Sequence, residues 1–248
     1  RAEFRGKLWV EVMLLPGYDF GQREYLMAIA ALPYVLLAAR RIEGPPAGLG
    51  LTLGVAMLAA VGFALKPHFL AVPALVEGYV LLRRGPSAAL RDPVPWTMAL
   101  LWVGYLASLP LVFPDYFNTV IPLVWRYYTD LGVFTFWSVL TAPVVMPLVP
   151  VVAGLLAGAF LLRGTGALAR VLALAAFGGF VSAWVQHKGW SYHVVPATVL
   201  SGAGIVALGA RLADRSIAPA RALAAAPVLA LVATFGLGTF TLRGEETP

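Results

Sequence analysis

The sequence predicts an all-α, polytopic transmembrane helix bundle with about eight apolar segments. Two observations lead to this fold class. The first is composition, because 60% of the 248 residues are hydrophobic and 12% are charged, against roughly 25% charged residues in a soluble domain. The second is the arrangement of apolar residues in long runs that approach the roughly 20 residues needed to cross a bilayer. Lipid is therefore the expected solvent for most of the chain.

The apolar runs follow one another with short polar breaks. The first run, Leu8–Pro16, is too short to span and contains Glu11. The apolar sequence over 131–162 is too long for one span, and predicts an interfacial piece near Phe134–Trp137 followed by a full segment. The expected spanning segments are Tyr25–Ala39, Ala47–Leu65, Phe69–Leu82, Val94–Phe113, Ala142–Leu162, Ala167–Val185, Val194–Ala210 and Ala222–Leu242.

The chain is expected to form a single transmembrane domain over residues 1–248. It opens at Arg1 on a short apolar run, without the pattern of a signal peptide. We therefore expect a fragment of a larger membrane protein whose earlier spans are missing. The sequence contains no cysteine, which excludes disulfides, thiolate catalysis and cysteine-based metal sites.

The net charge of +6 comes from basic residues that stand mainly at the ends of apolar runs. This placement indicates membrane topology, not a nucleic-acid partner, because cytoplasmic loops are enriched in lysine and arginine. If Arg40 and Arg41 are cytoplasmic and the spans alternate, 13 of the 18 lysines and arginines share that side. The cytoplasmic set is Arg1, Arg5, Lys7, Arg40, Arg41, Arg83, Arg84, Arg91, Arg163, Arg170, Arg211, Arg215 and Arg221, and the outer set is Arg23, Lys66, Arg126, Lys188 and Arg243.

Three small polar clusters are predicted to share the outer face, and all three histidines of the chain belong to them. The first cluster holds Asp19, Arg23 and Glu24, the second Lys66 and His68, and the third His187, Lys188, Tyr192 and His193. Lysine, arginine and histidine at the lipid–water boundary suit a ligand that carries phosphate. A neighbouring carboxylate, Asp19 or Glu24, could deprotonate an attacking hydroxyl or hold a divalent metal ion. No cofactor follows with certainty from these residues.

Simpler interpretations remain open for each cluster. Lys66 could snorkel from a helix end, and the first cluster could be a solvated loop with a local ion pair. Trp190 and Tyr192 could belong to an interfacial aromatic belt instead of stacking on a sugar. His187 and His193 could bind a metal, although a separation of six residues is not a ligand spacing on one helix. Glu77 stands inside an apolar run without an evident partner, so it is predicted to face a neighbouring helix or a wet cavity.

Two of these segments resemble motifs of a known family. The run Lys66–Pro73, Lys-Pro-His-Phe-Leu-Ala-Val-Pro, follows Gly62 and resembles the K-[GP]-x-x-L-x-x-P segment of GT-C membrane glycosyltransferases. The run Lys188–Pro196, Lys-Gly-Trp-Ser-Tyr-His-Val-Val-Pro, resembles their later K-x-x-x-Y-x-L-P segment with one extra residue before the proline. The family includes the lipid A aminoarabinose transferase, the protein O-mannosyltransferases and the rhizobial lipopolysaccharide glycosyltransferases. The resemblance covers roughly residues 19–196.

The resemblance implies transfer of a sugar from a polyprenyl-phosphate donor to a glycan, lipid or protein acceptor. The expected location is the bacterial cytoplasmic (inner) membrane, with the active face periplasmic. By motif position, Lys66 and Lys188 would contact the donor phosphate, with Tyr192 nearby. The catalytic acid of this family usually lies in the first outer loop, which we expect to precede this fragment, so Asp19 and Glu24 would belong to a later loop. The alternative function is a transporter or flippase of a lipid-linked or anionic solute.

Overall fold

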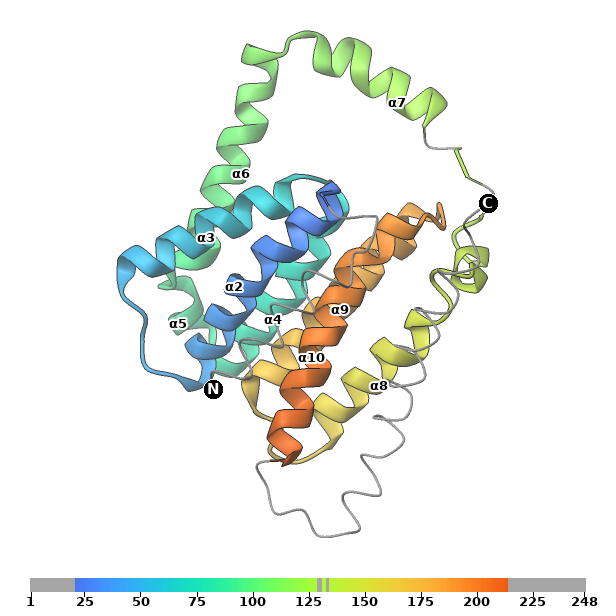
Figure 1. The fold of residues 1–248 in the computed structure, drawn as a ribbon. Helices are drawn as coiled ribbons and strands as arrows, with labels where there is room; N and C mark the ends of the chain where they lie inside the picture. The colour runs from blue at the N-terminus through green and yellow to red at the C-terminus, as the bar shows by residue number, and fades with distance from the viewer. Residues whose placement is uncertain (1–20, 129–130, 133, 214–248) are drawn as a thin grey trace.

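The computed structural model describes residues 21–128, 131–132 and 134–213 (Figure 1). Every regular element in those ranges is helical, and no strand occurs among them. The all-α fold class predicted from the sequence is therefore confirmed. The expected segment Ala222–Leu242, the short run Leu8–Pro16 and the candidate residue Asp19 lie outside the described residues.

Four helices are long and apolar enough to cross a membrane. They are α2 (Arg23–Glu43), α6 (Pro93–Val112), α9 (Gly166–Gln186) and the continuous helix formed by η5 (Ser191–Val194) and α10 (Val195–Ala213). Their ranges agree closely with the sequence prediction, and in α2 and α10 the arginines at the end of the apolar run also lie in the last turn of the helix. The last turn of α2, for example, contains Arg40 and Arg41, where cations interact favourably with the helix dipole.

Three further apolar segments form shorter helices, so eight full-length spans are not observed. Helix α3 (Leu49–Ala64) has 16 residues, and α4 (Ala71–Arg84) and α8 (Leu148–Leu161) have 14 each. At 1.5 Å per residue, α3 is about 24 Å long, short of the roughly 30 Å hydrocarbon layer. The expected start of α8 at residue 142 is wrong: the helix begins only after Pro143 and Pro147, since proline lacks the N–H that a helix interior requires.

Helix α9 lies at the centre of the bundle and packs against α10, α4, α2 and α8 (Figure 1). Apart from Arg170, Ser182 and Gln186, its residues are apolar or glycine, as expected of a helix surrounded by other helices. Two adjacent glycines allow its closest contacts. A Cβ atom added at Gly178 would lie 2.7 Å from Cα of Val72 in α4, and one at Gly179 would lie 2.8 Å from the backbone nitrogen of Ala197 in α10. Both neighbouring helices therefore approach the α9 backbone directly.

Helix α6 projects from this bundle and packs mainly along α3 (Figure 1). Its side chains are mostly exposed, although the indole of Trp102 donates a hydrogen bond of 2.9 Å to the carbonyl oxygen of Ala60 in α3. Beyond α6, a π-helical turn η3 (Tyr116–Val120) continues into α7 (Ile121–Tyr127). The short helix α5 (Pro86–Leu90) joins α4 to α6 at the other end.

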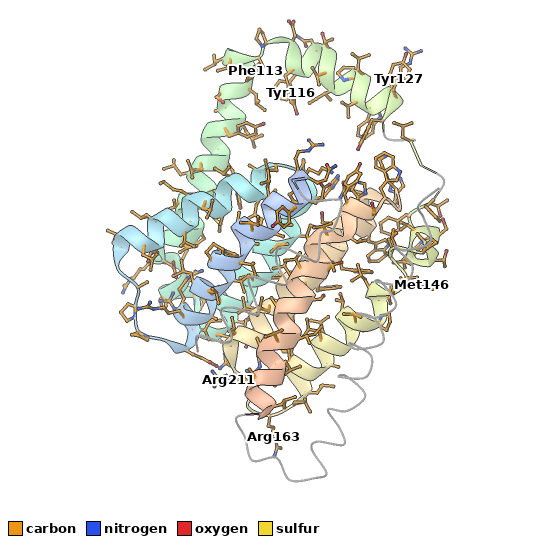
Figure 2. The ribbon with its side chains drawn as sticks, viewed as in Figure 1. Phe113, Tyr116, Tyr127, Met146, Arg163 and Arg211 are labelled. Carbon is orange, nitrogen blue, oxygen red and sulfur yellow. The ribbon has the colours of Figure 1, made fainter. Side chains whose placement is uncertain are left out.

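The alternating helices divide the molecule into two ends. Figure 2 shows Arg163 and Arg211 at one end and Phe113, Tyr116 and Tyr127 at the other. We call the first the arginine end, where α2, α4 and α10 finish, and the second the outer end, where α3, α6 and α9 finish. The two motif segments both lie at the outer end, as the sequence prediction requires.

The arginine end contains a buried network of ion pairs. Arg41 binds both carboxylate oxygens of Glu77, at 2.7 and 2.8 Å, and its Nε donates to Asp92 at 2.8 Å. Glu77 also accepts a hydrogen bond of 2.8 Å from the hydroxyl of Tyr34, and Asp92 forms a second ion pair with Arg84. Glu77 therefore has partners on a neighbouring helix. The arginines here also join helices, a role beyond the orientation signal inferred from the sequence.

Candidate functional site

Lys66 is directed into the protein by the proline that follows it. Helix α3 ends at Ala64, Lys66 is extended (φ −150°, ψ 140°), and Pro67 begins the 3-10 turn η2 (Pro67–Leu70). A residue that precedes proline is disfavoured in the helical region, so the helix stops here. Lys66 is only 9% exposed. The interpretation of Lys66 as a snorkelling lysine is therefore wrong.

The ammonium group of Lys66 joins three elements. It forms an ion pair with the carboxylate of Glu24 at the start of α2, and donates a 3.2 Å hydrogen bond to the side-chain oxygen of Gln186 at the end of α9. The amide of Gln186 in turn donates to the carbonyl oxygen of Ser182 at 2.9 Å. Glu24 is 1% exposed. Removing one partner of a buried ion pair costs about 3–5 kcal/mol, because it leaves the other charge uncompensated.

The first predicted cluster does not form a local ion pair among its described residues. Glu24 faces the protein interior and pairs with Lys66 across 42 positions of sequence, while Arg23 is exposed. For Glu24, this result corrects the interpretation as part of a solvated loop, whereas Asp19 and any pair that it forms with Arg23 lie outside the described residues. It also brings the first and second clusters into direct contact, through Glu24 and Lys66.

Lys188 stands between two residues with left-handed backbone. His187 ends α9 with φ 41° and Gly189 has φ 67°. Left-handed geometry favours glycine, and a Cβ atom at position 189 would lie 2.6 Å from the ring of Phe134. This sharp turn leads Lys188 inward, where its ammonium group donates 2.6 Å hydrogen bonds to the carbonyl oxygens of Tyr128 and Leu131. These hydrogen bonds of Lys188 connect the chain after α7, at Tyr128 and Leu131, to the end of α9.

Aromatic rings connect the two lysines. The ammonium group of Lys66 lies 5.3 Å from the ring centre of Tyr192, and that of Lys188 lies 5.5 Å from the ring of Trp190 and 4.5 Å from that of Tyr128. The rings of Trp190 and Tyr192 are 5.7 Å apart. Each lysine is thus within cation–π range of this group, and the second and third clusters meet through Tyr192.

His193 is the most deeply buried member of the third cluster, at 2% exposure. Its ring lies 4.5 Å from that of Tyr192 and 5.4 Å from that of Trp190. Neither ring nitrogen has a hydrogen-bond partner among the described residues. An unsatisfied buried polar group costs about 1–3 kcal/mol, so such a group in a native fold requires an explanation. A polar ligand that reaches the ring would supply one.

The two remaining histidines lie closer to the surface. His68, on η2, is half-buried, and burial lowers its pKa, as do the charge of Lys66 and the neighbouring His187. His68 is therefore neutral near pH 7 and offers a ring nitrogen as acceptor. His187 keeps Nδ1 within 3.0 Å of the carbonyl oxygen of Val185. In the described part of the chain, no three His, Asp or Glu side chains group as metal ligands.

The two motif segments have the same local architecture. In each, a helix ends before a lysine, a 3-10 turn carrying a histidine follows, and a second helix begins with a proline in its first turn. The two units are α3–η2–α4 and α9–η5–α10. Both η2 and α4 of the first unit pack against α9 of the second. No repeat was evident in the sequence, because the two segments share few identical residues outside Lys66, Lys188, Pro73 and Pro196.

Sequence reasoning missed Gln186 and Tyr128 as members of this cluster. Gln186 is a polar residue at the end of an apolar run, which is a weak signal that many helix ends share. Tyr128 contributes its backbone carbonyl and its ring, and a backbone contact leaves no trace in residue type. The structure thus assembles Glu24, Lys66, His68, His187, Lys188, Tyr192 and His193 at one end of the bundle, with Arg23 exposed beside them.

Searches of family models, curated proteins and solved structures found no match to this chain. The functional argument therefore depends on the geometry of this cluster and on the two motif segments.

Proposed function

We propose that this chain is a GT-C-type membrane glycosyltransferase, which transfers a sugar from a polyprenyl-phosphate-linked donor to an acceptor at the outer end. The observation that carries the proposal is the convergence of the two motif segments. Lys66 and Lys188 are separated by 122 positions, yet both are buried at the same end and contact the same aromatic group. Two buried cations beside unsatisfied imidazole nitrogens suit a ligand that brings negative charge and several acceptors.

Each group has a role that its surroundings support. Lys66 and Lys188 stabilise the donor phosphate as the sugar leaves, and charges in such a buried site act far more strongly than in water. The phosphate competes with the carbonyl oxygens of Tyr128 and Leu131 for the Lys188 ammonium. The ring of Trp190 offers an apolar face to the sugar.

The proposed reaction is an inverting displacement. The acceptor hydroxyl oxygen bonds to the anomeric carbon, the bond from that carbon to the phosphate oxygen breaks, and polyprenyl phosphate leaves with the electron pair. The hydroxyl proton passes to a carboxylate base. Glu24 and Asp19 are the candidates for that base within this chain. Glu24 has a carboxylate oxygen in contact with Lys66, so its pairing must rearrange when the acceptor binds.

The proposal also specifies the membrane and the orientation of the chain in it. The chain contributes about eight apolar segments to a multi-pass protein of the bacterial cytoplasmic membrane, with the outer end facing the periplasm and lipopolysaccharide or another cell-envelope glycan as acceptor. Support comes from the four long apolar helices and from the concentration of arginine at the opposite end.

A transporter or flippase is the competing assignment, and the position of the buried charges weighs against it. Transporters place substrate sites near the bilayer midplane, on broken helices. The ion pair of Glu24 and Lys66 lies where α2 begins and α3 has ended, and Glu77 is held by Arg41 near the arginine end. These charges thus belong to the ends of the bundle.

The test is binding of undecaprenyl phosphate to the purified full chain in detergent, followed by sugar transfer from a panel of undecaprenyl-phosphate sugars. Lys188→Ala is expected to weaken phosphate-dependent binding by about 100-fold, equivalent to roughly 2.7 kcal/mol, and to abolish transfer. Arg126→Ala removes an exposed cation of the same end from α7 and serves as the matched control, with wild-type behaviour expected.

Undecaprenol, which lacks the phosphate, should bind wild type and Lys188→Ala alike. Equal binding of undecaprenyl phosphate to both proteins, with their thermal unfolding unchanged, would overturn the assigned role of Lys188. Movement of an intact lipid-linked sugar across vesicle membranes without transfer would support the transporter instead.

A further inference from the structure

A second polar site lies at the arginine end, distant from the cluster described above. A pocket of about 450 Å³ opens between the end of α2, the start of α3 and the link from α4 to α6. Its size falls within the range of ordinary ligand sites. The side chains that the argument uses are Leu37, Arg40, Arg41, Leu49, Arg84 and Asp92.

The polar side of this pocket has an excess of hydrogen-bond donors. Asp92 is the single carboxylate of the lining, and its oxygens already accept from Arg41, Arg84 and the backbone nitrogen of Val94. All three guanidinium nitrogens of Arg41 are engaged, because the two terminal nitrogens donate to Glu77 and Nε donates to Asp92. Three arginines against one carboxylate therefore make this lining positively charged.

Two of the three arginines retain free donors. Arg40 uses Nε and one terminal nitrogen on the carbonyl oxygens of Pro45 and Pro46, at 2.8 and 3.2 Å. Arg84 uses one terminal nitrogen on Asp92, and its side chain is 31% exposed. The other terminal nitrogen of each guanidinium has no acceptor in the described part of the chain. Guanidinium groups with open positions match the oxygens of a phosphate.

The remaining lining is apolar and continues onto the lipid-facing surface. Leu37, Leu49 and the prolines at 45, 46 and 93 surround the arginines, and Leu49 is 64% exposed at the start of α3. Guanidinium donors that lie beside the exposed apolar start of α3 fit an amphiphilic ligand better than a free ion. Basic pockets between membrane helices bind anionic lipid headgroups on the cytoplasmic side.

We propose that this pocket binds the phosphate of an anionic membrane lipid, with Arg40 and Arg84 as the binding residues. The headgroup phosphate accepts from their free nitrogens, and an acyl chain runs along Leu49 and α3. Arg41 and Asp92 hold Arg84 in position. This site is independent of the proposed glycosyltransferase cluster, since no residue is shared and the two lie at opposite ends.

The test measures how lipids shift the thermal unfolding of the full chain in dodecyl maltoside, followed by its intrinsic tryptophan fluorescence. Dioleoylphosphatidylglycerol is expected to raise the unfolding temperature of the wild type, whereas zwitterionic dioleoylphosphatidylcholine at the same ratio is not. In the double variant Arg40→Gln/Arg84→Gln, the phosphatidylglycerol concentration that gives half of the shift should rise at least about tenfold, as expected for losing charged hydrogen bonds of about 1.4 kcal/mol or more.

The matched control is Arg83→Gln/Arg91→Gln, which removes the same charge from exposed arginines outside the pocket lining. It should respond to phosphatidylglycerol like the wild type. The single variant Arg40→Gln leaves the Arg84–Asp92 ion pair intact, and is used if the double variant unfolds. Equal loss of the response in the control and pocket variants, or an equal response to phosphatidylcholine, overturns the proposal. If inorganic phosphate alone at matched concentration raises the unfolding temperature equally, the pocket binds phosphate and the lipid assignment is overturned.

Discussion

His193 is buried among charged and aromatic neighbours but makes no hydrogen bond with a described residue. Lys66 and Lys188, by contrast, are each held by oxygen acceptors at hydrogen-bond distance. A buried histidine without hydrogen bonds lowers the free energy of unfolding. A ligand that hydrogen-bonds to its ring nitrogens would explain why the protein contains it. The role of His193 can therefore be separated from that of the lysines, because its removal is expected to raise stability and to lower activity.

Replacement of His193 by phenylalanine keeps a planar ring of similar size and removes both unsatisfied nitrogens. We expect His193→Phe to raise the unfolding free energy by about 1–3 kcal/mol, the cost of the buried polar group, and to lower transfer from a polyprenyl-phosphate donor. Thermal unfolding in detergent and the transfer assay on the same preparation measure the two effects. A destabilised variant with full activity would show that His193 is a structural core residue.

At the level of secondary structure, the glycine pair of α9 determines how closely the bundle packs. Gly178 and Gly179 face different neighbours, α4 and α10, and in each case the nearest atoms belong to backbone, which cannot move aside as a side chain would. Small residues that let backbones approach are a common means of packing membrane helices. The sequence did not single out this pair. Gly50 and Gly54 of α3, by contrast, have no heavy atom within 4 Å of an added Cβ.

Gly178→Val is expected to destabilise the bundle by at least about 1–3 kcal/mol through overpacking, because its Cβ would meet the backbone of Val72. Gly154→Val in α8 is the matched control, since a Cβ there meets no heavy atom within 4 Å. Resistance to unfolding by heat in detergent measures the difference. Equal stability of the two variants would contradict the close approach of α4 to α9.

For the whole molecule, the two ends of the bundle are chemically different. The arginine end joins its helices through Arg41, Glu77 and Asp92, and the outer end joins them through Glu24 and Lys66. Both networks connect residues that are far apart in sequence, so each depends on the complete arrangement of helices. The orientation in the membrane then determines which compartment each network faces.

Single cysteines test this orientation directly, because the natural chain has none. A cysteine replacing Arg126, exposed on α7, should react with a membrane-impermeant maleimide added to intact spheroplasts. A cysteine replacing Arg83, exposed at the end of α4, should react only in inverted vesicles. Labelling of both positions from the same side would disprove the alternating arrangement and, with it, the shared outer face.

Much of the helical arrangement follows from sequence because its signals are local. Apolar runs bounded by polar or charged residues predicted α2, α6 and α9 to within a few residues, and the alternation of spans placed both motif lysines at one end. The prediction failed at the start of α8, where three prolines lie within eight residues. A hydrophobicity pattern does not show that prolines lack the backbone N–H groups a helix requires, and these prolines move the start of α8 to a later residue.

For the candidate site, residue types predicted a group of cations and histidines on one face, and composition alone predicted lipid as the solvent. The sequence did not identify the partners. Glu24 was grouped with Arg23 and Asp19 but pairs with Lys66, and Glu77 was predicted to face a neighbouring helix, where Arg41 binds it. A local pattern carries information about hydrophobicity and backbone breaks within a few residues. Contacts across 36 to 120 positions depend on the packed arrangement of the helices, because a buried charge is tolerated only where the fold places an opposite charge or a hydrogen-bond partner beside it.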